Sequence, residues 1–157
     1  MGSSSPVGVA NISVDVHDRQ QAHRLDTNHL AELLAATLAT QHGDRLAEVG
    51  LAFVDEAEMT TLNELHMASS GPTDVLAFPI DGVHADASGP SDQPLMFGDI
   101  VICPQVAARA PQSLENEVAL LVVHGALHLV GHDHAELDET AVMKALEVQM
   151  LDRFHRT

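Results

Sequence analysis

Three histidines in the last third of the chain have the types and the spacing of metal ligands. His124 and His128 are four residues apart, so on a helix both imidazoles project from one face. Gly131 can end such a helix in the left-handed conformation, and the returning chain can then bring His134 to the same place. Three neutral imidazoles hold one Zn²⁺ and leave a fourth position for water, which is the pattern of a catalytic site. The sequence therefore predicts one zinc ion per chain, bound by His124, His128 and His134.

Two neighbours of these histidines allow alternative interpretations. His132 also lies four residues after His128, but it can serve as a ligand only if the helix continues through Gly131, so His134 is favoured. Asp133 is a candidate to orient a ligand imidazole through a hydrogen bond, although an acidic residue there equally suits a turn. The catalytic group itself is expected to be a water molecule on the zinc rather than a side chain.

Gly125 argues against one class of zinc enzyme. The spacing His-x-x-x-His-x-x-Gly-x-x-His is that of the metzincin peptidases, whose second position is the glutamate that acts as general base. Here that position is Gly125. General-base assistance typically contributes about 10²–10⁴-fold to a rate, so the chain is not expected to be a peptidase.

Composition limits the class of protein further. At 157 residues the chain is expected to form one domain, 1–157, with residues 1–6 disordered. No run of 18 apolar residues is present, which excludes a membrane-spanning helix. The single cysteine, Cys103, excludes an intrachain disulfide and fits a cytoplasmic protein. The net charge of −16 predicts long-range repulsion of nucleic acid.

Hydrophobic patterning predicts an α/β (α+β) domain, in which a four-stranded mixed sheet packs against a buried central helix that carries the metal ligands. The last helix is expected to present an apolar face made of Ala141, Val142, Ala145, Leu146, Val148 and Leu151. The expected strands are 11–16, 49–54, 73–78 and 97–103. The expected helices run from a cap at Asp26 to 41, from a cap at Asp55 to a break at 69–72, from a cap at Ser113 to 130 and from 137 to 154, with a short helix at Pro104.

Four segments, in order and at matching intervals, resemble the YbeY family of metal-dependent endoribonucleases. They are Leu62-Asn63, the run from Pro72 to Pro79, the run from Gly98 to Pro104 and the histidine segment from His124 to His134. The resemblance implies zinc on the three histidines and hydrolysis of single-stranded RNA. It also implies a role in maturation of the 3′ end of small-subunit rRNA and in ribosome quality control, in the cytoplasm.

The chain departs from the pattern of that family in several places. Many relatives carry an aromatic-Arg pair where His66-Met67 stand here, an aromatic residue at the position of His132 and Ser at the position of Ala77. Water and the neighbouring 2′-hydroxyl of RNA both remain possible nucleophiles. Asp74 and Asp99 are either structural caps or catalytic groups, and His84 and His155 are expected to be surface histidines.

Two other function classes remain open. An acidic surface pairs well with basic ribosomal proteins, so the chain can instead be a ribosome-assembly factor whose zinc mainly supports the fold. The third class is a zinc hydrolase that acts on another substrate. The expected partners are single-stranded RNA and rRNA, together with the small ribosomal subunit or basic ribosomal proteins, and no membrane.

Overall fold

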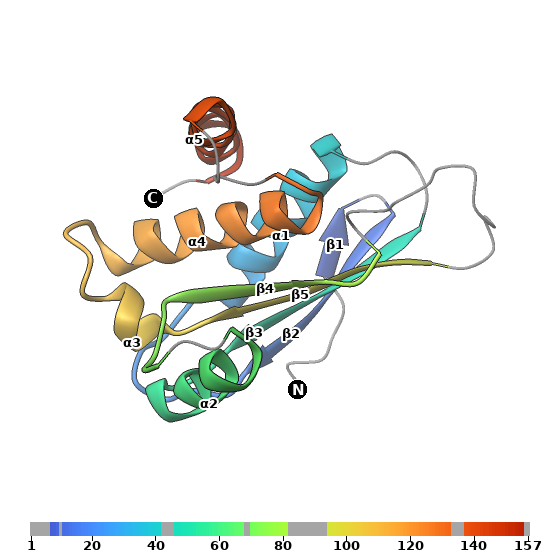
Figure 1. Ribbon diagram of the computed structural model, residues 1–157. Coiled ribbons are helices and arrows are strands. Elements are labelled where there is room, and N and C mark those ends of the chain that lie inside the picture. The colour runs from blue at the N-terminus through green and yellow to red at the C-terminus, as the bar shows by residue number, and fades with distance from the viewer. Residues whose placement is uncertain are drawn as a thin grey trace.

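The computed structural model describes residues 7–9, 11–41, 46–67, 70–81, 94–132 and 137–155. Within these ranges the strands form one mixed sheet in the order β1-β2-β3-β5-β4 (Figure 1). The central strands β2, β3 and β5 run parallel, and β1 and β4 are antiparallel edges. The predicted fold class is confirmed, and the short β1 adds a fifth strand to the four predicted ones. The strands are β1 (Val7–Val9), β2 (Ile12–Asp18), β3 (Ala47–Phe53), β4 (Val75–Pro79) and β5 (Leu95–Ile102).

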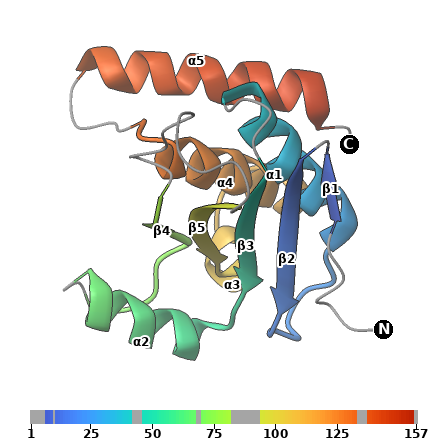
Figure 2. The same cartoon turned by 90° about the vertical axis from the view of Figure 1, so that its right-hand side faces the viewer.

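The helices lie in layers on the two faces of the sheet. α1 and α4 cover one face, α2 lies on the other, and α5 crosses over α4 and α1 on the side away from the sheet (Figures 1 and 2). α4 is therefore enclosed between the sheet and α5. None of the helices in the described ranges is long and apolar enough to cross a membrane. The helices are α1 (Thr27–Gln41), α2 (Glu56–His66), α3 (Pro104–Ala107), α4 (Leu114–Leu129) and α5 (Leu137–Phe154).

The three predicted helix caps are confirmed. A side-chain oxygen on the residue before each helix accepts a hydrogen bond from a backbone N–H that has no partner within the helix. Asp26 accepts from the N–H of His29 at 3.1 Å at the start of α1. Asp55 does the same for α2 at 2.8 Å and Ser113 for α4 at 3.2 Å. These caps fix where the helices begin, and so fix which residues of α4 face the sheet.

α4 is buried almost all round, as its apolar sequence predicted. Gly125 lies on the side that faces β5, where a Cβ would stand only 2.9 Å from Cγ2 of Ile100. The absence of a side chain at this position lets α4 sit close to the sheet. The buried apolar residues of α4 are Val118, Ala119, Leu121, Val122, Val123, Ala126, Leu127 and Leu129, and those of α1 include the predicted Leu30, Leu33, Leu34 and Leu38.

The apolar face expected for α5 was partly wrong. Val142 and Val148 are 53% and 67% exposed, whereas Met143 and Met150 are each only 2% exposed. The two methionines are seven residues apart, or about two helical turns, and their stripe also contains Glu147. A charged residue inside the stripe concealed it from a hydrophobicity pattern. Leu146, Leu151 and Phe154 complete the packing of α5 on the core.

Candidate metal centre

His124 and His128 project from the same side of α4, as their spacing predicted, and His124 reaches Glu147 of α5. Both side chains are half-buried, and their Nε2 atoms are 3.1 Å apart. Two nitrogens that each lie about 2.0–2.1 Å from one tetrahedral zinc ion are about 3.3–3.4 Å apart. The two imidazoles thus already stand near the separation that a shared metal ion requires. The two described imidazoles therefore fit two of the four ligand positions of the predicted zinc ion.

α4 ends before both candidates for the third ligand, His132 and His134. Gly131 has a φ of +101°, a conformation that glycine adopts without strain. Its N–H donates to the carbonyl of His128 and the N–H of His132 donates to that of Leu127, which is the pair of bonds of a Schellman motif. α4 therefore does not continue to His132, as the preference for His134 required.

His132 lies apart from the histidine pair. Its Nε2 is 3.2 Å from Oε1 of Gln41, at the end of α1. Within the described ranges no three His, Cys, Asp or Glu side chains are grouped to hold a metal ion, so His132 does not join His124 and His128. His134 and Asp133 lie outside the described residues, and their predicted roles remain predictions.

Glu147 of α5 contacts the imidazole of His124 at the nitrogen that points away from His128. Its Oε2 is 2.5 Å from Nδ1 of His124, and the side chains are 12% and 26% exposed. A carboxylate in that position accepts the Nδ1 proton, which leaves the lone pair of Nε2 directed toward His128. Sequence reasoning assigned this type of role to Asp133 and missed Glu147. The available signal was an acidic residue between Met143 and Met150, on the face of α5 that packs inward.

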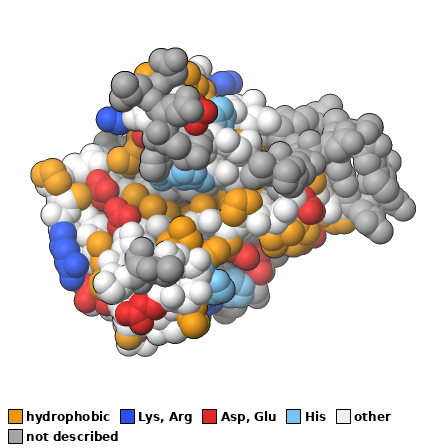
Figure 3. Space-filling model, viewed as in Figure 1, with side chains coloured by type: hydrophobic (Ala, Val, Ile, Leu, Met, Phe, Trp, Pro, Cys, Tyr) orange, Lys and Arg blue, Asp and Glu red, His pale blue; other side chains and the backbone are white. Residues whose placement is uncertain are grey.

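The described Lys and Arg side chains do not gather around the histidines that Figure 3 shows. Histidine side chains are visible just below α5, among apolar and neutral atoms, whereas Lys and Arg side chains on this view stand at its left edge and beside α5 (Figure 3). Two arginines are bound to carboxylates: Arg19 donates to Glu58 at 2.7 Å, and Arg109 pairs with Glu56. The side-chain hydrogen bond to Glu58 raises the pKa of Arg19.

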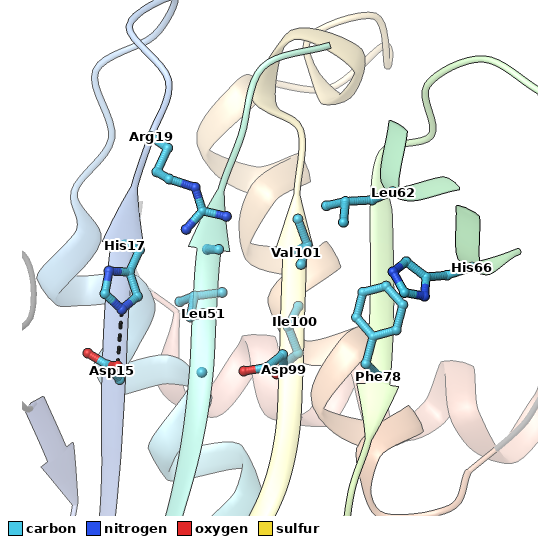
Figure 4. Close-up of a pocket in the computed structure, with 12 residues that line it drawn as sticks. Asp15, His17, Arg19, Leu51, Leu62, His66, Phe78, Asp99, Ile100 and Val101 are labelled. Atoms are coloured by element: carbon cyan, nitrogen blue, oxygen red, sulfur yellow. Dashed lines mark hydrogen bonds and ion pairs between the residues drawn. The ribbon is translucent and has the colours of Figure 1, made fainter. Parts of the chain in front are cut away.

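A pocket of about 480 Å³ lies on the opposite face of the sheet, beside α2. Asp15, Gly50 and Asp99 stand in one row across β2, β3 and β5. A Cβ on Gly50 would overlap the Asp99 carboxylate, which leans across β3 toward β2 (Figure 4). His17 bonds to Asp15 at 3.0 Å, and His66 packs edge-on against Phe78 at 5.2 Å between ring centroids.

The sheet separates this pocket from the histidine pair. Ile100 points to α4, and the preceding residue Asp99 therefore points to the other face. Asp99 is thus not part of the metal centre. The backbone carbonyl of Asp74 accepts the N–H of Cys103, a bond that does not involve the Asp74 carboxylate. Cys103 is fully buried, and burial raises the pKa of its thiol.

His155 was expected to be an ordinary surface histidine, and this was wrong. It links three helices beside a hollow of about 590 Å³ at the N-terminal ends of α1 and α4. Its Nε2 donates to Oδ1 of Asn116 at 2.9 Å, so its Nδ1 is left to accept from Nε2 of His29 at 2.8 Å. Burial, with His29 close by, lowers the pKa of His155 below its ordinary value of 6.5. His84 lies outside the described residues.

This network predicts a pH-dependent contribution to stability. Because the pKa of His155 is lower in the folded chain, the unfolded chain binds its proton first, and stability falls as the pH drops below about 6.5. His155→Ala is expected to lower the free energy of unfolding by about 1 kcal/mol at pH 7.5, through the lost hydrogen bonds. The loss should shrink toward pH 5.5. Urea unfolding of both proteins at the two pH values measures it, and an equal loss at both would contradict the prediction.

Comparisons with known proteins agree with the sequence resemblance. The family model described as Endoribonuclease YbeY matches residues 14–155. Endoribonuclease YbeY of Thermobifida fusca is 41% identical over 150 residues, covering 93% of this chain and 96% of the relative. Its counterpart in a Nocardioides species is 40% identical over 136 residues, covering 84% and 91%. The solution structure of TM1509 from Thermotoga maritima superposes with a TM-score of 0.56 at 25% identity, covering 89% of this chain and 90% of that one.

Proposed function

Because the chain belongs to the YbeY family, we propose that it is an endoribonuclease that cuts single-stranded RNA with one zinc ion held by His124, His128 and His134. The observation that carries the zinc assignment is the 3.1 Å separation of the two Nε2 atoms on α4. The turn at Gly131 supports it, because the chain leaves the helix axis there, before His134.

In this proposal the described side chains hold and orient the zinc ion rather than provide a nucleophile of their own. A bound zinc ion supplies Lewis-acid chemistry there, by polarising a phosphoryl oxygen or by acidifying a water molecule. Glu147 accepts the Nδ1 proton of His124 and leaves Nε2 of His124 to hold the zinc ion. Gly125 provides no general base, so water and the RNA 2′-hydroxyl both remain open as the nucleophile.

The proposed substrate is the 3′ end of small-subunit rRNA, and the proposed role includes ribosome quality control in the cytoplasm. A chain with 23 acidic and 7 basic residues binds free RNA weakly, because few cations can displace phosphate counterions. The small subunit therefore presents the RNA. Asp15, Glu48 and Asp99 are exposed on the open face of the sheet, and this acidic surface suits a basic ribosomal protein.

The test is cleavage of one RNA sequence as a single strand and as a duplex by the purified, zinc-loaded chain. Slow cleavage confined to the single strand is expected, with a shallow dependence of RNA binding on salt. Addition of the small subunit should make cleavage faster or more selective. Tight binding of RNA by the chain alone, with a steep salt slope, would contradict the electrostatic argument.

The same assay tests the acidic face. Asp99→Asn is expected to reduce stimulation by the small subunit more than it reduces cleavage of free RNA. Glu32→Gln removes an exposed carboxylate from α1 instead, and should keep the stimulation. Equal effects of the two variants would argue against this surface as the docking site. If no RNA is cut with any metal or partner, a ribosome-assembly factor with a structural zinc ion becomes the better proposal.

A further inference from the structure

We propose that Glu147 is a positioning residue of the metal centre, which fixes the tautomer and the direction of His124 and so makes α5 part of the site. This inference rests on the proposed zinc site but not on the identity of the substrate. The role assigned to Glu147 concerns the tautomer of the His124 imidazole and its affinity for zinc, and both can be measured without RNA. Glu147 is not itself a ligand in this proposal, because it meets the nitrogen of His124 that points away from His128.

The contacts of His124 indicate which of its ring nitrogens carries the proton in the neutral imidazole. A carboxylate only accepts hydrogen bonds, so the 2.5 Å contact with Glu147 places a proton on Nδ1 of His124. A neutral imidazole with its proton on Nδ1 has its lone pair on Nε2. That Nε2 is the atom that faces His128 at 3.1 Å. The carboxylate therefore selects the tautomer that a metal ion needs, and its negative charge makes the ligand nitrogen more basic.

The burial of Glu147 supports a dedicated role. Its side chain is only 12% exposed, and it lies on the stripe of α5 that buries Met143 and Met150. A carboxylate taken out of water in such a place is costly unless it is paired and hydrogen-bonded. A leucine there would pack α5 against α4 without that cost. An acidic residue on the packed face of α5 is therefore explained by its partner, His124, rather than by helix packing.

The arrangement links the docking of α5 to the affinity for metal. α5 reaches the core through Met143 and Met150, which flank Glu147 one turn away on each side. Its distal end is tied to α1 and α4 by His155. Small displacements of α5 would move the carboxylate away from Nδ1 of His124. The metal site thus depends on a helix that contributes no ligand of its own in the described ranges.

The experiment compares Glu147→Ala, Glu147→Gln and the matched control Glu139→Ala, which removes an exposed carboxylate from the same helix. Zinc affinity of the full chain is measured by competition with a chromophoric chelator, and the tautomer of His124 by ¹⁵N NMR of the zinc-free protein. Glu147→Ala should lower zinc affinity by about 10–100-fold, the usual effect of losing such a partner. It should also shift His124 toward the tautomer with its proton on Nε2.

The remaining variants separate positioning from packing. Glu147→Gln keeps an oxygen that accepts from Nδ1, so it should restore the tautomer and part of the affinity. Glu139→Ala should change neither. A Glu147→Ala protein that keeps the wild-type tautomer and zinc affinity would overturn the proposal, even if its Tm is lower. If the wild-type chain cuts no RNA while these shifts appear, the proposed substrate fails and the role of Glu147 stands.

Discussion

Replacing His128 with alanine is expected to abolish stable zinc binding and to reduce RNA cleavage to background. His128 supplies one of the two nitrogens that already stand 3.1 Å apart on α4, and its side chain is half-buried. Loss of a partner outside the ligand set costs about 10–100-fold in metal affinity, so loss of a ligand should cost more. His128 is a better target than His124, whose removal would also leave the carboxylate of Glu147 buried without this partner.

Zinc content after dialysis, measured by elemental analysis, decides this prediction together with two further variants. His134→Ala should lose the metal as His128→Ala does. His132→Ala should retain it, because His132 lies beyond the end of α4 and bonds to Gln41. If His132→Ala loses zinc and His134→Ala keeps it, the ligand set is wrong.

Local signals in the sequence were sufficient to predict most of the fold. The sequence predicted the caps at Asp26, Asp55 and Ser113 because each is a short polar residue directly before an apolar run with helical periodicity. A side-chain oxygen in that position accepts a hydrogen bond from a backbone N–H of the first turn. The apolar circumference of α4 predicted its central position. The face of α5 was harder to predict, since its inward stripe mixes Met143 and Met150 with a buried carboxylate.

The candidate metal centre was predictable only where its geometry is local. His124 and His128 share a helix face, so their spacing alone places them together. Glu147 comes from α5, and no spacing along the chain reports which residue of one helix will meet a given residue of another. The same reason explains why His155 was misjudged: its partners His29 and Asn116 lie on different helices. Long-range pairs of this kind become visible only in the folded chain.

Gly125→Glu, which restores the residue type of the metzincin peptidases, is expected to destabilise the fold strongly and to give no peptidase activity. Gly125 is buried, and a Cβ there would lie 2.9 Å from Cγ2 and 3.2 Å from Cδ1 of Ile100, which is itself fully buried. Overpacking of a core typically costs about 1–3 kcal/mol. An unpaired carboxylate against the sheet adds several kcal/mol more. The sum is a large part of the roughly 5–15 kcal/mol that stabilises a typical domain.

Gly125→Ala is the matched control, because it adds the same Cβ without the carboxylate. Alanine gains about 1 kcal/mol of helix propensity over glycine, which offsets part of its overlap with Ile100. For a chain of this size 1 kcal/mol corresponds to about 2–4 °C in Tm, so Gly125→Glu should melt at least about 10 °C below Gly125→Ala. Thermal unfolding of both variants measures this difference, and an assay on an unfolded protein substrate tests for proteolysis. A Gly125→Glu protein that melts like the control and cuts peptides would mean that residue 125 faces the metal rather than β5.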